Sequence, residues 1–217
     1  MAHVAVILSG SGHQDGSEIH EAVLVLLELS IQGHTYQIFA PNQDQACTVN
    51  HLTHQKTQEK RNCLVEAARI ARGDIHDLKE LKEASFDALI FPGGFGAAMN
   101  LCNFAEKGPL CTVNTTISSI IQSFFKAKKP IGATCIAPVI LAKALQGVEN
   151  ISMTLGSSSQ DQNTLKSMGV QAALVSADQC LIDSAHQIFT TPCYMEKASI
   201  AKIHTGIQKM IQAMFKR

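Results

Sequence analysis

The fold is decided by one stretch of sequence, Pro130-Ile131-Gly132-Ala133-Thr134-Cys135-Ile136-Ala137-Pro138. Residues 130–134 have the character of a buried strand, and residues 136–145 that of a helix. Cys135 therefore falls where a strand meets a helix, with a small residue two positions before it and another two positions after it. This small-x-nucleophile-x-small pattern is typical of a nucleophile elbow, a tight turn that exposes its central side chain at the carboxyl end of a sheet.

Short apolar runs alternate with longer helical patterns on both sides of this junction. The predicted strands and strand-like segments cover residues 3–8, 35–39, 87–91, 130–134, 151–155, 180–183 and 187–190. The predicted helices cover residues 17–32, 59–72, 97–106, 114–127, 136–145, 161–168 and 195–215. This alternation predicts an α/β fold, with a mostly parallel sheet and helices on both faces. Residues 42–57 are polar and are expected to form a surface insertion.

The composition is that of an ordinary globular chain of 217 residues, 46% of them hydrophobic but only 5% aromatic, so aliphatic side chains must supply most of the core. The 18 Lys and Arg balance the 18 Asp and Glu, and no net field favours nucleic acids or acidic membranes. Residues 3–8 are typical of a strand rather than a signal peptide, and polar residues interrupt the uncharged stretch 108–125. We therefore expect no nucleic-acid partner, no membrane span and a cytoplasmic location.

The 7 cysteines, at positions 47, 63, 102, 111, 135, 180 and 193, form no C-x-x-C pair. They fit neither a disulfide framework nor a zinc knuckle, so we expect most to be reduced and many to be buried. A cysteine taken at random is usually a buried structural residue, and that is the alternative for Cys135. The elbow pattern favours a nucleophile, because the following helix would direct free N–H groups at the sulfur and stabilise the thiolate.

Gly93-Gly94 closely follows a predicted strand and is the first candidate partner of Cys135. Glycine lets a backbone approach a ligand closely. One N–H group of this pair and the N–H of Ile136 could together hold a developing oxyanion. The alternative is a simple glycine turn.

Glu18 and Glu21 lie three residues apart in the first turns of the helix predicted at 17–32, and so share one face. Asp15 and Glu18 have the spacing of a capping box, which gives Glu18 a possible structural or supporting role. Glu21 precedes an apolar run of residues. We predict that its carboxyl group faces the crevice as an acid or base.

Other motifs give weaker signals. Gly10-x-Gly12 followed by Gly16 suggests a dinucleotide site, but the third glycine is one residue late and the strand at 35–39 ends without an acidic residue. His51 and His54 lie in the polar insertion, and no zinc-protease motif occurs. The sequence therefore predicts no cofactor and no metal.

No histidine has the position that a cysteine hydrolase needs. Ile136 follows Cys135, whereas His186 and His204 lie in a predicted turn and in the last helix. Hydrolysis of peptides or amides is therefore poorly supported. Two interpretations are open for Arg61, Asn62 and Glu66. These residues either line the pocket or form a surface helix with ion pairs, and we favour the surface helix.

Together these features resemble the ElbB (enhancing lycopene biosynthesis) family, part of the PfpI-type superfamily with the class I glutamine amidotransferase-like fold. The resemblance covers nearly the whole chain in order and is carried by residues 15–23, 61–73, 91–98, Cys135-Ile136-Ala137-Pro138 and 190–195. It implies a single domain over residues 1–217, built as a flavodoxin-like three-layer α/β sandwich and often forming a homodimer. It also implies Cys135 as nucleophile, Glu21 as its carboxyl neighbour, and the N–H groups of Gly94 and Ile136 as oxyanion hole, with Gly93 in support.

Members of this family are also called glyoxalases. The implied activity is the cofactor-independent conversion of a small 2-oxoaldehyde, glyoxal or methylglyoxal, to a 2-hydroxy acid through a Cys135 hemithioacetal. Deglycation of modified proteins would use the same residues. The alternative is a non-catalytic redox or aldehyde sensor, or an accessory protein of isoprenoid biosynthesis. An ionised Glu21 near the sulfur would raise the thiol pKa and a protonated one would lower it, so the two groups are coupled.

Overall fold

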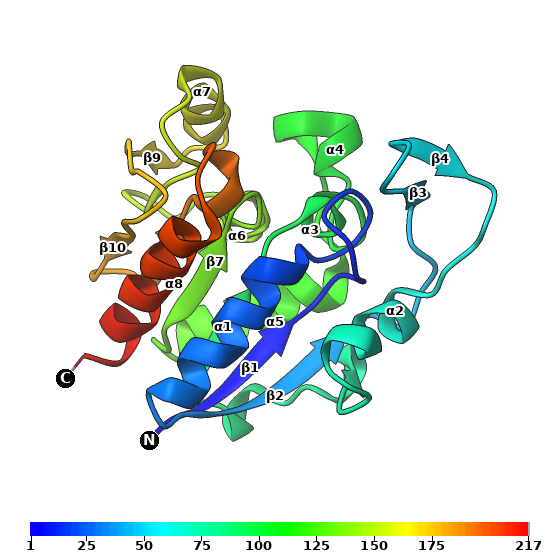
Figure 1. Cartoon of the computed structure of the whole chain (residues 1–217). Coiled ribbons are helices and arrows are strands. Elements are labelled where there is room, and N and C mark those ends of the chain that lie inside the picture. The colour runs from blue at the N-terminus through cyan, green and yellow to red at the C-terminus, as the bar shows by residue number, and fades with distance from the viewer. Residues whose placement is uncertain (217) are drawn as a thin grey trace.

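The computed structural model describes residues 1–216, which contain a seven-stranded sheet in the order β10-β11-β7-β6-β1-β2-β5 (Figure 1). Its strands are β1 (His3–Ile7), β2 (Thr35–Ala40), β5 (His76–Asp77), β6 (Ala88–Phe91), β7 (Ile131–Thr134), β10 (Leu181–Asp183) and β11 (Ile188–Thr191). Neighbouring strands run parallel, except that β10 is antiparallel to β11. The predicted α/β fold with a mostly parallel sheet is confirmed.

Helices cover both faces of this sheet. Helices α1 (Ile19–Ile31), α2 (Cys63–Ile70) and α8 (Ile200–Phe215) pack on one face, and α3 (Phe95–Met99), α5 (Thr115–Lys126) and α6 (Pro138–Ala144) on the other. Figure 1 shows α1 and α8 side by side on the near face. Strand β1 explains this arrangement: Val4 and Val6 point into one apolar layer and Ala5 and Ile7 into the other, because successive side chains of a strand alternate.

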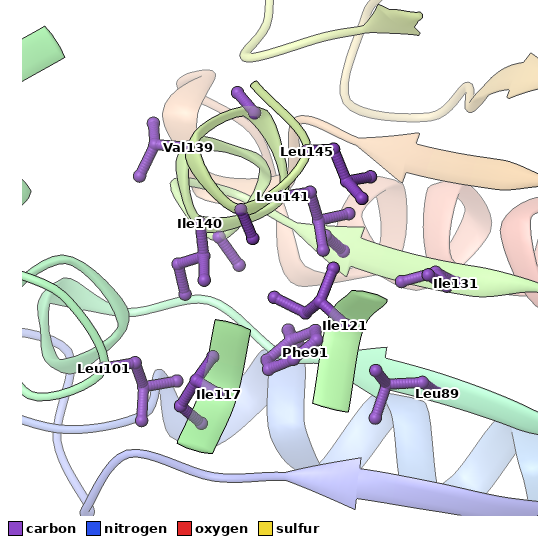
Figure 2. Packing of buried hydrophobic residues seen from close by; sticks show 14 of the residues in the cluster. Leu89, Phe91, Leu101, Ile117, Ile121, Ile131, Val139, Ile140, Leu141 and Leu145 are labelled. Atoms are coloured by element: carbon purple, nitrogen blue, oxygen red, sulfur yellow. The ribbon is translucent and has the colours of Figure 1, made fainter. Parts of the chain in front are cut away.

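The layer beneath α5 and α6 is the larger part of the core. Figure 2 shows Phe91 of β6 and Ile131 of β7 packed against Ile117, Ile121 and Leu141. All five side chains are fully buried. Each such burial stabilises the fold by roughly 1.5–3 kcal/mol, so aliphatic packing carries the core as the composition predicts.

The helix predicted at 97–106 is in fact two helices, α3 and α4 (Phe104–Lys107). Asn100, between them, is buried and donates hydrogen bonds from Nδ2 to the carbonyl oxygens of Ser9 and Asp15, at 2.8 and 2.9 Å. Its Oδ1 accepts from the N–H of Ala46. A side chain that joins three segments fixes the chain direction here, so tertiary hydrogen bonds override the helical pattern.

Three further segments differ from the predicted elements. The insertion at 42–57 contains an antiparallel hairpin of β3 (Thr48–Asn50) and β4 (Gln55–Thr57). Strand β8 (Ser152–Met153) pairs in parallel with β9 (Gln171–Ala172), and the two form a separate small sheet connected by α7 (Ser159–Ser167). The last helix, predicted from residue 195, begins at Ile200 with Ser199 as its N-cap. Residues Cys193–Met195 form a separate 3₁₀ turn.

None of the helices described in residues 1–216 combines the length and the apolar character that a bilayer span requires.

Candidate active site

Cys135 lies in a tight turn between β7 and α6. Its φ of 56° is left-handed, a conformation that costs a non-glycine residue roughly 1–2 kcal/mol. The turn is held by two hydrogen bonds, from Cys135 N to Thr191 O at 3.0 Å and from Ala137 N to Thr134 O at 2.9 Å. Strand, strained turn and helix therefore follow one another as the elbow pattern predicts, and Cys135 is a buried residue, 8% exposed.

Glu21 projects from the first turn of α1 and is fully buried. Its Oε2 accepts hydrogen bonds from the Thr134 hydroxyl at 2.6 Å and from the Gly93 N–H at 3.1 Å. Its Oε1 accepts from the Tyr194 N–H at 3.3 Å. The carboxyl group also contacts the Cys135 thiol. Three donors besides the thiol thus fix a carboxyl group beside the sulfur.

The two positions that follow Pro92 after β6 require glycine, Gly93 for steric reasons and Gly94 because of its backbone conformation. A Cβ on Gly93 would lie 2.3 Å from Cys135 Cβ and 2.5 Å from Glu21 Oε2, closer than atoms can approach. Gly94 has a φ of 100°, which favours glycine. Its N–H and that of Ile136 lie near the Cys135 sulfur and lower the pKa of the thiol. The loop therefore brings two main-chain donors to the point where charge would develop.

Burial dominates the electrostatics of this pair. It raises the pKa of Glu21 to about 7, against the opposing hydrogen bond from Thr134. Burial, and then the Glu21 charge, raise the pKa of the Cys135 thiol well above its ordinary value, although the N–H groups of Gly94 and Ile136 lower it. The sequence led us to expect a thiolate stabilised by the following helix. That expectation is wrong for the resting protein, because two N–H donors do not replace the hydration that the sulfur loses on burial.

Glu18 has a different role from the one its spacing suggests. Glu18 itself is the N-cap of α1, and its Oε2 accepts from the Glu21 N–H at 2.7 Å. Asp15 does not start a capping box. Its buried carboxylate accepts from the Val49 N–H at 2.7 Å and so ties the first loop to the β3–β4 hairpin. The Glu18 side chain therefore fixes the backbone that carries Glu21.

Arg61, Asn62 and Glu66 belong to the start of α2. Asn62 caps the helix by accepting from the Val65 N–H at 3.1 Å. Arg61 pairs with Glu59 at 2.7 Å and with Glu66 at 3.6 Å, and Arg69 pairs with Glu66 at 3.1 Å. The ion pairs expected of a surface helix are present, but Glu66 itself is buried, so the expected surface position is wrong for this residue.

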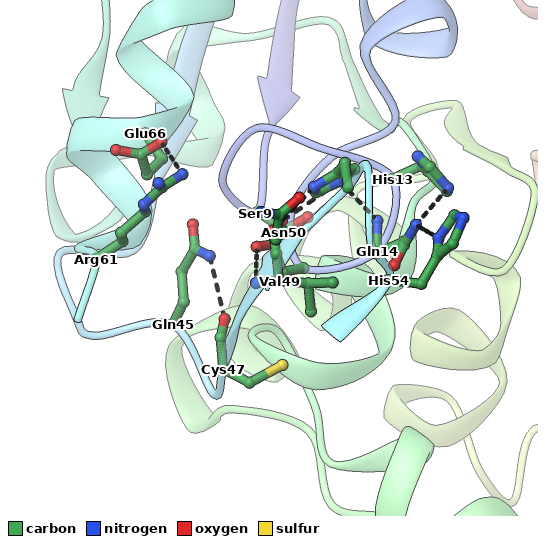
Figure 3. A network of polar contacts seen from close by, with 12 residues as sticks. Ser9, His13, Gln14, Gln45, Cys47, Val49, Asn50, His54, Arg61 and Glu66 are labelled. Carbon is green, nitrogen blue, oxygen red and sulfur yellow. Dashed lines mark hydrogen bonds and ion pairs between the residues drawn. The ribbon is translucent and has the colours of Figure 1, made fainter. Parts of the chain in front are cut away.

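The insertion histidines contact the loop after β1 (Figure 3). Gln14 Nε2 lies 2.6 Å from His54 Nδ1 and 3.3 Å from His13 Nε2, and the Gln14 N–H bonds to His51 Nε2 at 3.3 Å. Within residues 1–216, no group of three or more His, Cys, Asp or Glu side chains is arranged to hold a metal ion.

Sequence reasoning missed Thr134, the backbone of Tyr194 and the thiol of Cys193. Thr134 is buried and bonds both to Glu21 and to the Gly93 N–H, at 2.6 and 2.8 Å. A hydroxyl directly before the cysteine in an otherwise apolar strand is the signal that could have identified it. The contacts of residues 193 and 194 depend on β11 pairing with β7, which no local pattern specifies.

The site can be compared with known proteins. The sequence pattern of the DJ-1/PfpI family matches residues 74–190. Human glutamine amidotransferase-like class 1 domain-containing protein 3, mitochondrial, is 42% identical over 97% of this chain and 81% of its own length. The zebrafish (Danio rerio) ES1 protein, mitochondrial, is 32% identical over 89% of this chain and 77% of its own length.

Solved structures are also similar to this chain. An isoprenoid biosynthesis protein with an amidotransferase-like domain from Ehrlichia chaffeensis has a TM-score of 0.93 and 36% identity, covering 99% of this chain and 98% of its own. DJ-1beta from Drosophila melanogaster has a TM-score of 0.56 and 16% identity, covering 99% of this chain and 91% of its own, and so shares the fold.

The cytoplasmic location expected from the sequence is contradicted, because the curated relatives are named mitochondrial proteins. The expectation rested on residues 3–8, which have the character of a strand and not of a secretory signal. That pattern bears on secretion alone and carries no information about other compartments.

Proposed function

The chain belongs to the DJ-1/PfpI family, and we propose that it converts glyoxal or methylglyoxal to the corresponding 2-hydroxy acid without a cofactor. One observation carries this proposal. The Cys135 thiol lies beside a fully buried carboxyl group, and the main-chain N–H groups of Gly94 and Ile136 lie close enough to lower its pKa. A nucleophile, a base and an oxyanion site thus lie together, which is what addition to a carbonyl requires.

The first step is addition of the Cys135 sulfur to the aldehyde carbon. The thiol is protonated at rest, so Glu21 takes its proton as the sulfur–carbon bond forms. With a pKa of about 7, this carboxyl group is a proton acceptor near neutral pH. The aldehyde oxygen becomes an alkoxide held by the N–H groups of Gly94 and Ile136. Transfer of the proton to that oxygen gives the hemithioacetal and restores the carboxylate.

The second step moves a proton between the two carbons of the substrate. The Glu21 carboxylate removes the C1 proton to give an enediolate, and then delivers a proton to C2. The product is a 2-hydroxy thioester of Cys135, which water hydrolyses to the free acid and the thiol. The net change is addition of one water to the 2-oxoaldehyde. No amide leaving group is protonated, so the chemistry does not need the histidine that is missing beside Cys135.

The test is turnover of glyoxal by the purified protein in the absence of thiol cofactor, with glycolate measured as product. We expect Cys135→Ala to reduce formation of glycolate to the uncatalysed background. Cys47→Ala is the matched control, since Cys47 is a partly exposed cysteine on the insertion, and it should retain activity. Unchanged turnover in Cys135→Ala would remove the proposed nucleophile.

A second candidate is an accessory role in isoprenoid biosynthesis. It is favoured by the name of the Ehrlichia chaffeensis protein, whose chain matches this one over nearly its whole length. It also fits the resemblance of this sequence to the ElbB family. Absence of turnover with glyoxal, methylglyoxal and glycated peptides would favour this role over glyoxalase and deglycase activity.

A further inference from the structure

A second thiol lies just beyond the strand next to the elbow. In the parallel pair β7–β11, Thr134 is opposite Thr191, and the Cys135 N–H bonds to the Thr191 carbonyl oxygen at 3.0 Å. Cys135 is one residue beyond this pair and Cys193 is two residues beyond it. Both cysteines thus closely follow the ends of two paired strands, whose backbones lie about 4.8 Å apart, and Cys193 begins the 3₁₀ turn Cys193–Met195. Disulfides span Cα separations of about 4.4–6.8 Å.

The two side chains face the same side of the sheet. Cys135 and Cys193 belong to one apolar cluster, under α1 and α8, and Cys193 is fully buried. Cys193 has a left-handed φ of 44°, which a non-glycine residue rarely adopts. The surrounding structure therefore holds the backbone at Cys193 in an unfavourable conformation.

Polar contacts connect the two sulfurs through the site. The Cys193 thiol lies beside the hydroxyl groups of Thr191 and Thr134, which lower its pKa. Thr134 in turn donates to Glu21 at 2.6 Å, and Glu21 contacts the Cys135 thiol. The base that accepts the proton of Cys135 is thus one hydroxyl away from the second thiol. Burial raises the pKa of both thiols, so each needs such a base to react.

We propose that Cys193 is a resolving thiol that converts oxidised Cys135 into an intramolecular disulfide. The oxidant is a hydroperoxide. Cys135 sulfur attacks the peroxide and takes up one oxygen, giving a sulfenic acid while the peroxide is reduced to water or an alcohol. Cys193 sulfur then attacks the sulfenic sulfur, the S–S bond forms, and the hydroxyl leaves with the Cys193 proton as water. This goes beyond aldehyde conversion and depends only on the reactivity of Cys135.

The other cysteines have different positions. Cys102 and Cys111 contact each other, but in the cluster on the opposite face of the sheet. Cys180 precedes β10 and is partly exposed. Cys180 and Cys193 fall in the same tryptic peptide, so Cys180→Ala is the matched control for Cys193→Ala.

The experiment treats the full chain with an excess of hydrogen peroxide, more than three equivalents, blocks free thiols and maps peptides by mass spectrometry without reduction. We expect the wild type and Cys180→Ala to give a Cys135–Cys193 cross-linked peptide, with loss of two hydrogens, reversed by dithiothreitol. Cys193→Ala should instead accumulate Cys135 with two and then three added oxygens. Circular dichroism of each variant confirms folding.

Wild-type protein that accumulates doubly oxidised Cys135 as fast as Cys193→Ala, or that forms no cross-link, would overturn the proposal. Glyoxal turnover is measured separately on untreated wild type. A cross-link without turnover would refute the glyoxalase function and leave the resolving role of Cys193 in place. Turnover without a cross-link would refute the resolving role and leave the glyoxalase function in place.

Discussion

Glu21 is a carboxyl group enclosed by protein, and its burial links stability to chemistry. Burial raises its pKa from 4.5 to about 7. Between these values the folded state binds more protons than the unfolded state, so the contribution of this group to stability falls as pH rises from 4.5 and is lowest above 7. Folding thus leaves an unfavourable charge at neutral pH, and that charge is the base the mechanism uses.

Glu21→Gln removes this charge and should change the pH dependence of stability. The free energy of unfolding of the variant, relative to wild type, is expected to increase by about 3 kcal/mol between pH 4 and pH 8. Urea denaturation at a series of pH values measures it. The exposed Glu149→Gln is the control and should show a flat difference. A flat difference for Glu21→Gln would mean that the carboxyl group is not desolvated.

Gly93→Ala tests how closely the elbow and the glycine loop approach. The new methyl group would collide with Cys135 Cβ and the Glu21 carboxylate. We expect a loss of about 1–3 kcal/mol in stability together with loss of glyoxal turnover. Gly73→Ala is the comparison, because its Cβ meets nothing within 4 Å although its φ is 85°. It should lose about 1 kcal/mol and keep turnover. Full activity in Gly93→Ala would contradict the geometry.

Among the helices, N-cap side chains show which helices have a start signal in the adjacent sequence. Asn62 starts α2: its Oδ1 accepts from the Val65 N–H, and its Nδ2 donates to Asn42 in the segment after β2. Asn62→Ala is expected to lower stability by about 1 kcal/mol without changing glyoxal turnover. Asn163→Ala, at an exposed position inside α7, should leave stability unchanged or slightly raised. Equal effects of the two changes would show that the cap contributes nothing.

The elements also show how far sequence reasoning reaches. Strands β1, β6 and β7 and helices α1, α5 and α8 were predictable, because each has a long apolar pattern or a clear boundary. The break between α3 and α4 was not, since it depends on Asn100 reaching residues far away in the sequence. Strands β5 and β9 have two residues each and leave no periodic signal.

At the scale of the whole molecule, the sheet order assembles the site. β1, β6, β7 and β11 are consecutive across the sheet, so residues 21, 93, 135 and 194 meet at the carboxyl ends of parallel strands. The elbow, the glycine pair and Glu21 were predictable as candidates from local sequence and family resemblance. Thr134 and Cys193 were not, because their contacts depend on register and on the turn after β11.

The homodimer implied by the family resemblance stays a prediction. Light scattering coupled to size exclusion should give twice the chain mass. If the dimer forms away from the elbow, Cys135→Ala should have the same mass. A single-chain mass at micromolar concentration would contradict the prediction.

The proposed mechanism requires that Glu21 takes the proton of Cys135. The most direct measurement is kcat/KM for glyoxal between pH 5 and 9, for wild type and Glu21→Gln. We predict that the wild-type value rises with pH around a midpoint of about 7, the pKa of Glu21, and that the variant is slow and lacks this midpoint. A variant that keeps both the wild-type rate and the midpoint would contradict the claim.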